Sequence, residues 1–181
     1  MEHGRQIAPA SPQGHRACVI GVGHESRGDD AVGLCIADLL STMLVERIDI
    51  LKHTGEERSL TDLWRGYGIV IVVGAANPDS HPGSIWRLDV SNSTIPDNMF
   101  RFKTHTVGIG ESARMARFHN ALPPMAIALG IEGVRFGAGE ALSLHVENAI
   151  PDAISMVCSE LQTLLGEPVC EKGVGSCTNM V

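Results

Sequence analysis

Two adjacent carboxylates, Asp29 and Asp30, follow a glycine-rich loop that joins a predicted strand to a predicted helix. From Gly23 to Gly28 the loop has the G-x-x-x-x-G spacing of a phosphate-binding loop, but these two acids replace the Lys-Ser/Thr pair that would contact phosphate. A helix N-terminus stabilises carboxylates, yet two of them would repel a bound phosphate. The loop therefore predicts a cation site.

Residues from other parts of the chain could complete such a site. His105 precedes a predicted helix and Gly74 ends a predicted strand, and both are expected at the same edge of the sheet as Asp30. A carboxylate and an imidazole from separate loops suit a borderline transition metal such as nickel or zinc. Asp29 has a competing structural role, because an acid at this position often caps the helix, and Asp30 would then face the cleft.

Further polar side chains could support this site. His24, within the glycine loop, is the second choice among the histidines after His105, and His53 and His81 could lie at the rim. Glu56 follows the predicted second strand and could bind a cation or a peptide amine, although it could equally be an exposed acid in a turn.

The apolar patterns predict the elements that would position these residues. Strands are expected at 17–22, 45–51, 69–73, 84–90 and 125–131, and helices at 29–44, 59–64, 109–119 and in a last helix that has Pro151 in its first turn and ends near Leu165. Alternating strands and helices predict an α/β fold whose mostly parallel sheet is covered on both faces, with 84–90 as an antiparallel edge strand. Ligands in such sheets bind beyond the carboxyl ends of the strands.

Length and composition predict one domain over 17–166, with a flexible leader over 1–16 and a tail over 167–181. The net charge of -7 and the lack of basic runs argue against a nucleic-acid surface. The five cysteines include no C-x-x-C pair, which favours reduced thiols in the cytoplasm. No apolar run reaches the roughly 18 residues of a membrane span.

Taken together, these motifs resemble those of the hydrogenase maturation proteases, the endopeptidases that trim the C-terminus of the large subunit of nickel-iron hydrogenases. The resemblance runs from about Ala17 to Leu165. It implies a three-layer α/β/α sandwich and a site in which an acid after the glycine loop, an acid after the third strand and a histidine hold a metal. Four motifs carry it in order: Gly21-Val22-Gly23 with Arg27-Gly28-Asp29-Asp30 and Gly33; Ile69 to Ala76 with Pro82-Gly83; Thr104 to Gly108; and Leu129 to Gly133.

The resemblance assigns the first acid to Asp30 and the histidine to His105. The second acid falls on Gly74, which departs from the family's pattern, and His24 stands where the family commonly has Asn. Three explanations of Gly74 remain open. Asp79 or His81 could supply the missing ligand, the nickel held by the substrate could dominate recognition, or the chain could be a relative that binds without cutting.

Three functions follow as hypotheses. The first is a nickel-dependent endopeptidase that uses Asp30 and His105, supported by Asp29, to recognise a hydrogenase large-subunit precursor whose own nickel it contacts, with no organic cofactor. The second is a non-cleaving binding protein or assembly chaperone for the same precursor, favoured by Gly74. The third and weakest is an NADP-binding protein, because Lys52 could meet a 2′-phosphate.

Overall fold

A computed structural model describes residues 16–44, 46–54, 59–77, 81–93 and 109–169 of the chain. In this part of the chain, five strands form one sheet in the order β2-β1-β3-β5-β4. Their bounds are β1 (Ala17–Val22), β2 (Ile48–His53), β3 (Ile69–Ala76), β4 (Ile85–Asp89) and β5 (Met125–Glu132). All neighbours pair in parallel except β4, which runs antiparallel to β5. The predicted mostly parallel sheet with one antiparallel edge strand is confirmed.

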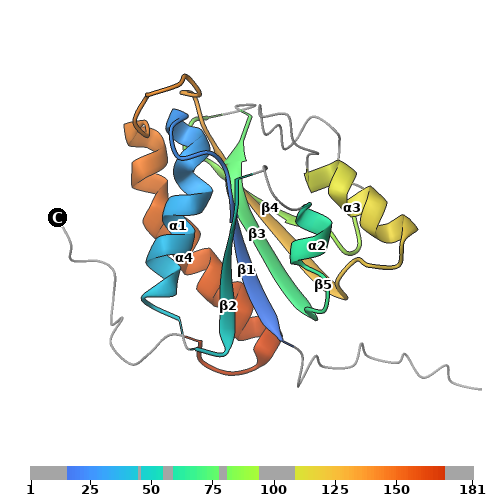
Figure 1. Cartoon of the computed structure of the whole chain (residues 1–181). Helices are drawn as coiled ribbons and strands as arrows, with labels where there is room; N and C mark the ends of the chain where they lie inside the picture. Colours follow the sequence, from blue (N-terminus) through green and yellow to red (C-terminus); the bar gives the residue numbers. More distant parts are fainter. Residues whose placement is uncertain (1–15, 45, 55–58, 78–80, 94–108, 170–181) are drawn as a thin grey trace, which may run out of the picture.

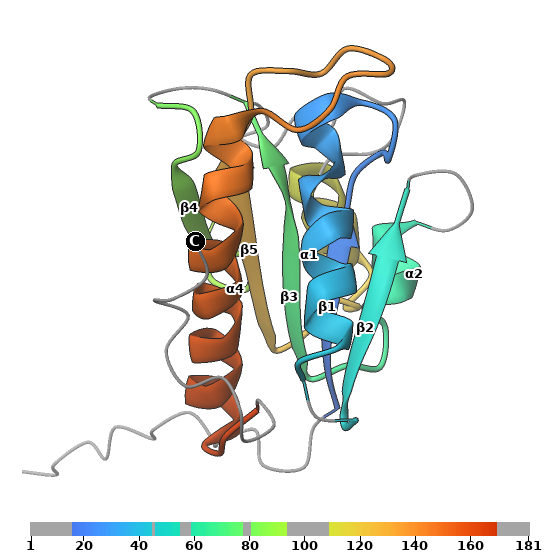
Figure 2. The same ribbon diagram turned by 90° about the vertical axis from the view of Figure 1, so that its left-hand side faces the viewer.

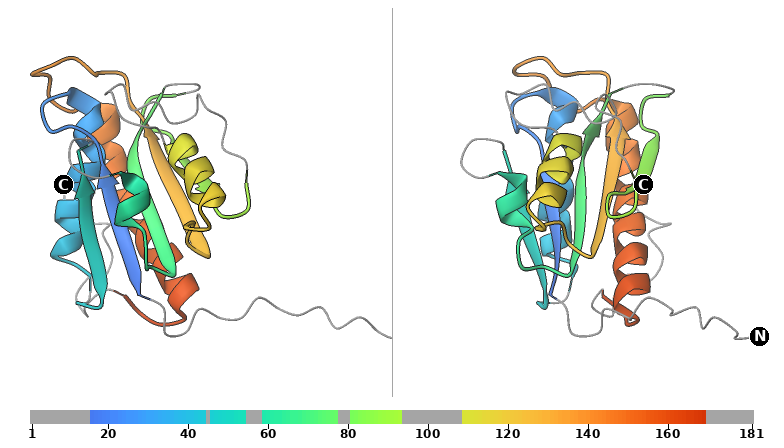
Figure 3. Two further views of the ribbon diagram at one scale, coloured as in Figure 1. Left: turned by 45° about the vertical axis from the view of Figure 1, so that its right-hand side comes forward. Right: turned by 90° about the vertical axis from the view of Figure 1, so that its right-hand side faces the viewer.

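Helices cover both faces of this sheet. One face carries α1 (Val32–Ser41) and α4 (Leu144–Leu165), and the other carries α2 (Leu60–Leu63) and α3 (Ile109–Phe118) (Figures 1 and 3). Side chains of β3 alternate between the two buried apolar clusters, since Ile71 and Val73 pack towards α1 and α4 while Val72 packs towards α2 and α3. The fold is thus α/β in three layers. None of the described helices has the length and apolar character to cross a membrane.

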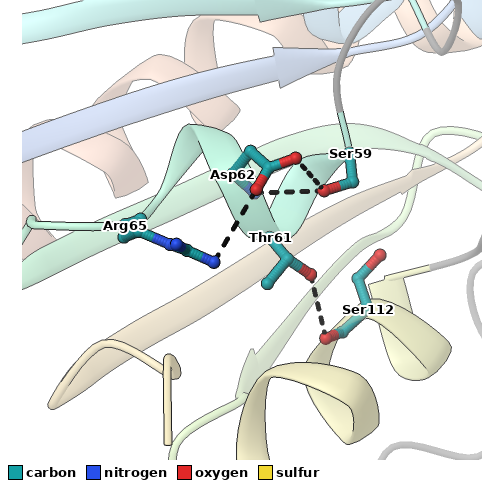
Figure 4. Close-up of polar contacts among 5 residues, drawn as sticks. All are labelled: Ser59, Thr61, Asp62, Arg65 and Ser112. Atoms are coloured by element: carbon teal, nitrogen blue, oxygen red, sulfur yellow. Dashed lines mark hydrogen bonds and ion pairs between the residues drawn. The ribbon is translucent and has the colours of Figure 1, made fainter. Parts of the chain in front are cut away.

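Polar contacts fix the short helix α2 beside α3 (Figure 4). The hydroxyl of Ser59 caps α2 by accepting the backbone N–H of Asp62 at 3.2 Å, and it donates to the Asp62 carboxylate at 2.7 Å. Arg65 lies 3.8 Å from the same carboxylate. Thr61 then donates its hydroxyl to the carbonyl of Ser112 in α3 at 3.4 Å. These contacts hold α2, which Ser59 caps, in the layer that it forms with α3.

Two strands, β2 and β3, differ from the prediction by more than one residue at an end. The second strand runs over Ile48–His53 in place of 45–51, because its pairing with β1 extends to the pair of Val22 with His53. The third strand does not end at Gly74 but continues to Ala76, since Gly74 and the two residues after it pair in register with β5. Gly74 therefore lies inside the sheet and not in the loop that follows it.

The start of the last helix also differs. This helix, α4, begins at Leu144 behind the N-cap Ser143, so Pro151 lies in its interior and the prediction of a first-turn proline is wrong. Proline removes one helical hydrogen bond at such a position. The helix continues through it because residues on both sides, including Ala149 and Ala153, are buried against the core.

Residues after α4 return to the domain. Val169 is buried in the cluster beneath α1 and α4, and Arg47 forms an ion pair with Glu167 and donates to the carbonyl of Pro168 at 3.0 Å. The structure describes the predicted tail only as far as Val169, and the predicted leader only at Arg16. The free ends of both segments lie outside the described residues.

Candidate functional site

The carboxyl ends of β1 and β3 mark the point where the strand order reverses. The chain leaves β1 to form β2 on one side, while β3 pairs with β1 on the other side. Open α/β sheets bind their ligands at such a switch point. The glycine loop after β1 lies at this end of the molecule, beside the connection over 133–143 that joins β5 to α4 (Figure 2).

Asp29 and Asp30 lie in a 3-10 turn, η1 (Gly28–Ala31), that leads into α1. The predicted helix over 29–44 is therefore a short turn followed by a shorter helix. A Cβ atom on Gly33 would lie 2.3 Å from the carbonyl oxygen of Val22 and 2.4 Å from that of Val73, so glycine lets α1 touch the ends of both strands. This close approach places Asp30, one turn earlier, at the end of β3.

Asp29 is fully buried and binds the β5–α4 connection. Its Oδ2 atom accepts the backbone N–H groups of Val134 at 2.7 Å and Arg135 at 2.8 Å and the hydroxyl of Ser143 at 3.0 Å, while Oδ1 accepts the backbone N–H of Ser143 at 2.6 Å. Neither η1 nor α1 has a side-chain cap. The expectation that Asp29 caps the helix is wrong; it fastens a distant connection to η1.

Asp30, the neighbour of Asp29, is also buried, with 4% of its surface exposed. Burial raises the pKa of its carboxyl group, and the electrostatic effects of Arg27 and, next, His24 lower it. A carboxylate whose charge is poorly solvated gains more from an approaching cation than an exposed one does. Asp30 therefore has the character expected of a cation-binding acid.

His24 lies half-buried in the glycine loop, on the side of Asp30. Its Nδ1 atom is 3.3 Å from the backbone N–H of Ser26 and 3.1 Å from the Ser26 hydroxyl. Because an N–H group donates to Nδ1, the proton of the neutral ring is on Nε2. In this orientation the Nε2–H group of His24 can donate a hydrogen bond, whereas Nδ1 already accepts one and has no lone pair left for a metal. A supporting role of His24 would therefore be that of a hydrogen-bond donor.

Glu132 is a buried acid that the sequence reasoning included in a motif without giving it a role. It ends β5, is 0% exposed, and accepts a hydrogen bond from Nε1 of Trp86 in β4. Its partner on the adjacent strand, β3, is Ala76. The pair of Ala76 with Glu132 lies two residues beyond the pair of Gly74 with Gly130, on the same face of the sheet. The signal in the sequence was an acid at the end of an otherwise apolar strand.

Two histidines named as rim candidates have different environments. His53 is the last residue of β2, two residues beyond the predicted end of that strand, and is 6% exposed. Burial lowers its pKa. His81 is exposed in the connection before β4, and its carbonyl accepts the backbone N–H of Ser84 at 3.0 Å. Of the two, His81 is exposed and His53 is buried, and their roles at the rim of the site stay predictions.

Three candidate residues, His105, Glu56 and Asp79, lie outside the described residues, so their roles stay predictions. Within the described ranges, no three His, Cys, Asp or Glu side chains gather into a metal site. Carboxylate oxygen is a suitable donor for a divalent cation, but a carboxylate such as that of Asp30 leaves most coordination positions to other ligands.

A cavity of about 530 Å³ opens at the opposite end of the sheet. It is bordered by the segments that lead into the amino ends of β3 and β5, and it lies away from the carboxyl ends where Asp30 is found. The cavity belongs to none of the predicted sites. Its lining consists of Trp64 to Tyr67 and His119 to Pro124.

Comparison with known proteins identifies one family. The family model described as hydrogenase maturation protease matches residues 44–160. This stretch contains Gly74, His105 and Glu132, whereas the glycine loop with Asp30 precedes it. Among curated proteins, none matches the chain by sequence.

Solved structures share the fold along most of the chain. The hydrogenase maturating endopeptidase HybD from Escherichia coli is 22% identical, with a TM-score of 0.67 over 86% of this chain and 98% of its own. An endopeptidase from Escherichia coli reaches a TM-score of 0.72 at 19% identity over 88% of this chain and 99% of its own. A hydrogenase 2 maturation peptidase from a Thaumarchaeota archaeon is 25% identical, with a TM-score of 0.56 over 81% of this chain and 97% of its own.

The family match and the fold agree with the motifs from which the resemblance started. The matched stretch spans more than half of the 181 residues, and the α/β fold is shared with the solved maturation peptidases. On this basis the chain belongs to the hydrogenase maturation protease family and is a peptidase.

Proposed function

We propose that this peptidase trims the C-terminus of a nickel-iron hydrogenase large-subunit precursor and recognises it through nickel that the precursor holds. The observation that carries the proposal is the place of Asp30, a buried acid at the switch point of the sheet in a member of this family. The described residues do not enclose a metal by themselves. A metal that is already bound to the substrate needs only partial coordination from the protease.

In the proposed reaction, Asp30 and His105 contact the precursor's nickel from the protein side. The ion would act as a Lewis acid on the nearby peptide carbonyl or on the attacking water. Water adds to the carbonyl carbon, the C–N bond breaks, and the leaving amine takes up a proton. Asp29 contributes indirectly, because its four hydrogen bonds fix η1 and hence the backbone of Asp30.

The proposal requires no organic cofactor and places the reaction in the cytoplasm. No disulfide joins the described cysteines, Cys18, Cys35 and Cys158, which is compatible with a reducing compartment. The NADP-binding alternative depends on Lys52, whose ammonium group lies 2.5 Å from the Asp38 carboxylate in an exposed ion pair. That lysine is already paired within the chain.

The proposal is tested by incubating the purified chain with nickel-loaded and nickel-free precursor and measuring release of the C-terminal peptide by mass spectrometry. We expect trimming of the nickel-loaded precursor alone. Asp30→Asn should slow it about 100-fold, which corresponds to about 2.7 kcal/mol of activation free energy. Asp152→Asn is the matched control, because Asp152 is an exposed acid on α4.

Two results would count against this function. Equal trimming of nickel-free precursor would remove the recognition of nickel, and equal rates for Asp30→Asn and Asp152→Asn would remove Asp30 from the site. Capture of the precursor without any trimming would favour the non-cleaving binding protein that Gly74 suggests.

A further inference from the structure

We propose that Val134 and Leu144, two exposed apolar residues beside this site, contact an apolar part of the precursor when it is bound for cutting. We call these two residues the apolar pair. The identity of the partner rests on the proposed function, whereas the contact itself involves no metal.

The carboxylate of Asp29 places both residues next to the turn that carries Asp30. Its Oδ2 atom accepts the backbone N–H of Val134 at 2.7 Å and the hydroxyl of Ser143 at 3.0 Å. Leu144 follows Ser143 directly and is the first residue of α4. Because the two donors meet on one oxygen atom, the chain leaving β5 and the chain entering α4 lie side by side there. The apolar pair is therefore at the same end of the sheet as Asp30, which follows Asp29 in η1.

Both side chains of the apolar pair are open to water. Val134 is 45% exposed and Leu144 is 72% exposed, and among the described residues neither belongs to the two buried apolar clusters or to the side chains packed against them. A single exposed apolar residue is ordinary on a protein surface. Here two of them come from the two ends of one connection and lie beside a buried acid at the switch point of the sheet. Their exposure therefore fits a surface that a partner covers.

Hydrogen bonds hold the connection between β5 and α4 in place before a partner arrives. Three of them join its backbone to the glycine loop and η1: the N–H of Asp29 donates to the carbonyl of Arg135 at 2.7 Å, that of Gly139 to Ser26 at 2.7 Å, and that of Gly28 to Glu140 at 3.1 Å. In α4, His145 touches the segment before β4, since a Cβ atom on Gly83 would lie 2.6 Å from its carbonyl oxygen. A surface that is ordered in advance loses little conformational freedom when a partner binds.

The size of a protein interface brings the apolar pair into contact with a protein that reaches Asp30. Asp30 is 4% exposed, so most of the contact area must come from more exposed side chains around it. Stable interfaces bury about 800 Å² on each partner, a patch that extends roughly 15 Å from its centre. The apolar pair lies within such a patch, because Asp29, the neighbour of Asp30, binds the backbone at Val134 and at the residue before Leu144. Apolar area that is removed from water in this patch favours binding.

Initial rates of trimming of nickel-loaded precursor test the contact. Leu144→Ser should raise KM about tenfold and Val134→Ser about fivefold, since each removes apolar area from the contact. The value of kcat should change less than about twofold in both variants, because neither side chain touches the reacting atoms. Asp30→Asn should instead lower kcat.

Phe118→Ser is the matched control. Phe118 is 82% exposed and precedes His119, which lines the cavity at the opposite end of the sheet, so its replacement should leave KM unchanged. Urea unfolding of all three serine variants should match that of the wild type, since each replaces an exposed side chain. If one variant of the apolar pair fails to fold, the other decides, because the two residues lie at different ends of the connection.

The outcomes separate the contact from the proposed function. Wild-type KM in both Leu144→Ser and Val134→Ser, with trimming intact, overturns the contact while the proposed function stands. If the wild type binds the precursor without trimming it, titration calorimetry supplies the comparison, and about tenfold weaker binding by Leu144→Ser supports the contact although the proposed function fails. A KM that rises equally in Phe118→Ser, or no binding of the precursor by the wild type, also overturns the contact.

Discussion

The substitution Asp29→Asn tests most directly whether Asp29 holds η1 against the segment that joins β5 to α4. In the wild type, one oxygen of Asp29 accepts three hydrogen bonds and the other accepts the backbone N–H of Ser143 at 2.6 Å. An asparagine can place its oxygen where the three bonds converge, but its NH2 group then faces the N–H of Ser143. Two donors oppose each other in a buried place, and the three remaining bonds lose their negative acceptor.

The expected loss of stability follows from these contacts. Exchange of a charged for a neutral acceptor should cost about 0.5–1 kcal/mol for each of the three remaining bonds, and a buried unsatisfied N–H about 1–3 kcal/mol more. The sum is about 4 kcal/mol. Since a domain of this size is stable by about 5–15 kcal/mol, the variant should still fold, with a Tm lower by about 8–16 °C.

Urea unfolding followed by circular dichroism measures this loss. Asp38→Asn is the control, because Asp38 forms an exposed ion pair with Lys52, and such pairs contribute about 0–1 kcal/mol. We also expect Asp29→Asn to slow precursor trimming, since η1 carries Asp30. Equal stability of Asp29→Asn and Asp38→Asn would refute the conclusion that Asp29 fastens the two segments together.

Three further changes test other parts of the structure. Gly33→Ala should destabilise the protein by about 1–3 kcal/mol in urea unfolding, because its new Cβ would meet the carbonyl oxygens of Val22 and Val73; wild-type stability would contradict that contact. Burial raises the pKa of the Cys18 thiol to about 12, so Ellman's reagent at pH 8 should label Cys18 only after unfolding, and rapid labelling of the native protein would contradict its burial. Burial lowers the pKa of His53, so the unfolded chain binds a proton more readily than the native protein, and the free energy of unfolding should fall as the pH drops below 6.5. In urea unfolding over the same pH range, the His53→Asn variant should lose less stability than the wild type. Equal losses in both proteins would contradict the conclusion that His53 causes the pH dependence.

The sequence predicts the order and type of the elements well because these depend on local patterns. The β-branched run from Ile69 identifies a central strand, and the glycine loop identifies the turn into α1. Boundaries depend on partners that no local pattern reveals. Gly74 continues β3 only because Gly130 is its partner, and Pro151 draws attention away from Ser143, whose hydroxyl caps α4.

The same distinction applies to the site. Asp30 could be named from the loop, because the acids directly follow the glycines. The role of Asp29 could not, since its four donors come 105 to 114 residues later in the chain. Glu132 was part of a motif but its position relative to Gly74 could not be predicted, because that position depends on the pairing of β3 with β5. The metal-binding role of His105 stays a prediction from the resemblance.

The hydrogen bonds of Asp29 also bear on the order in which the protein becomes functional. They join a turn near the start of the chain to Ser143, the residue from which the last helix begins. During synthesis, η1 has no partner for its buried carboxylate until β5 and the connection after it have been made. We therefore expect a nascent chain that ends before residue 143 to hold Asp30 loosely, so that the ability to act on a precursor arises only after the start of α4 has been synthesised.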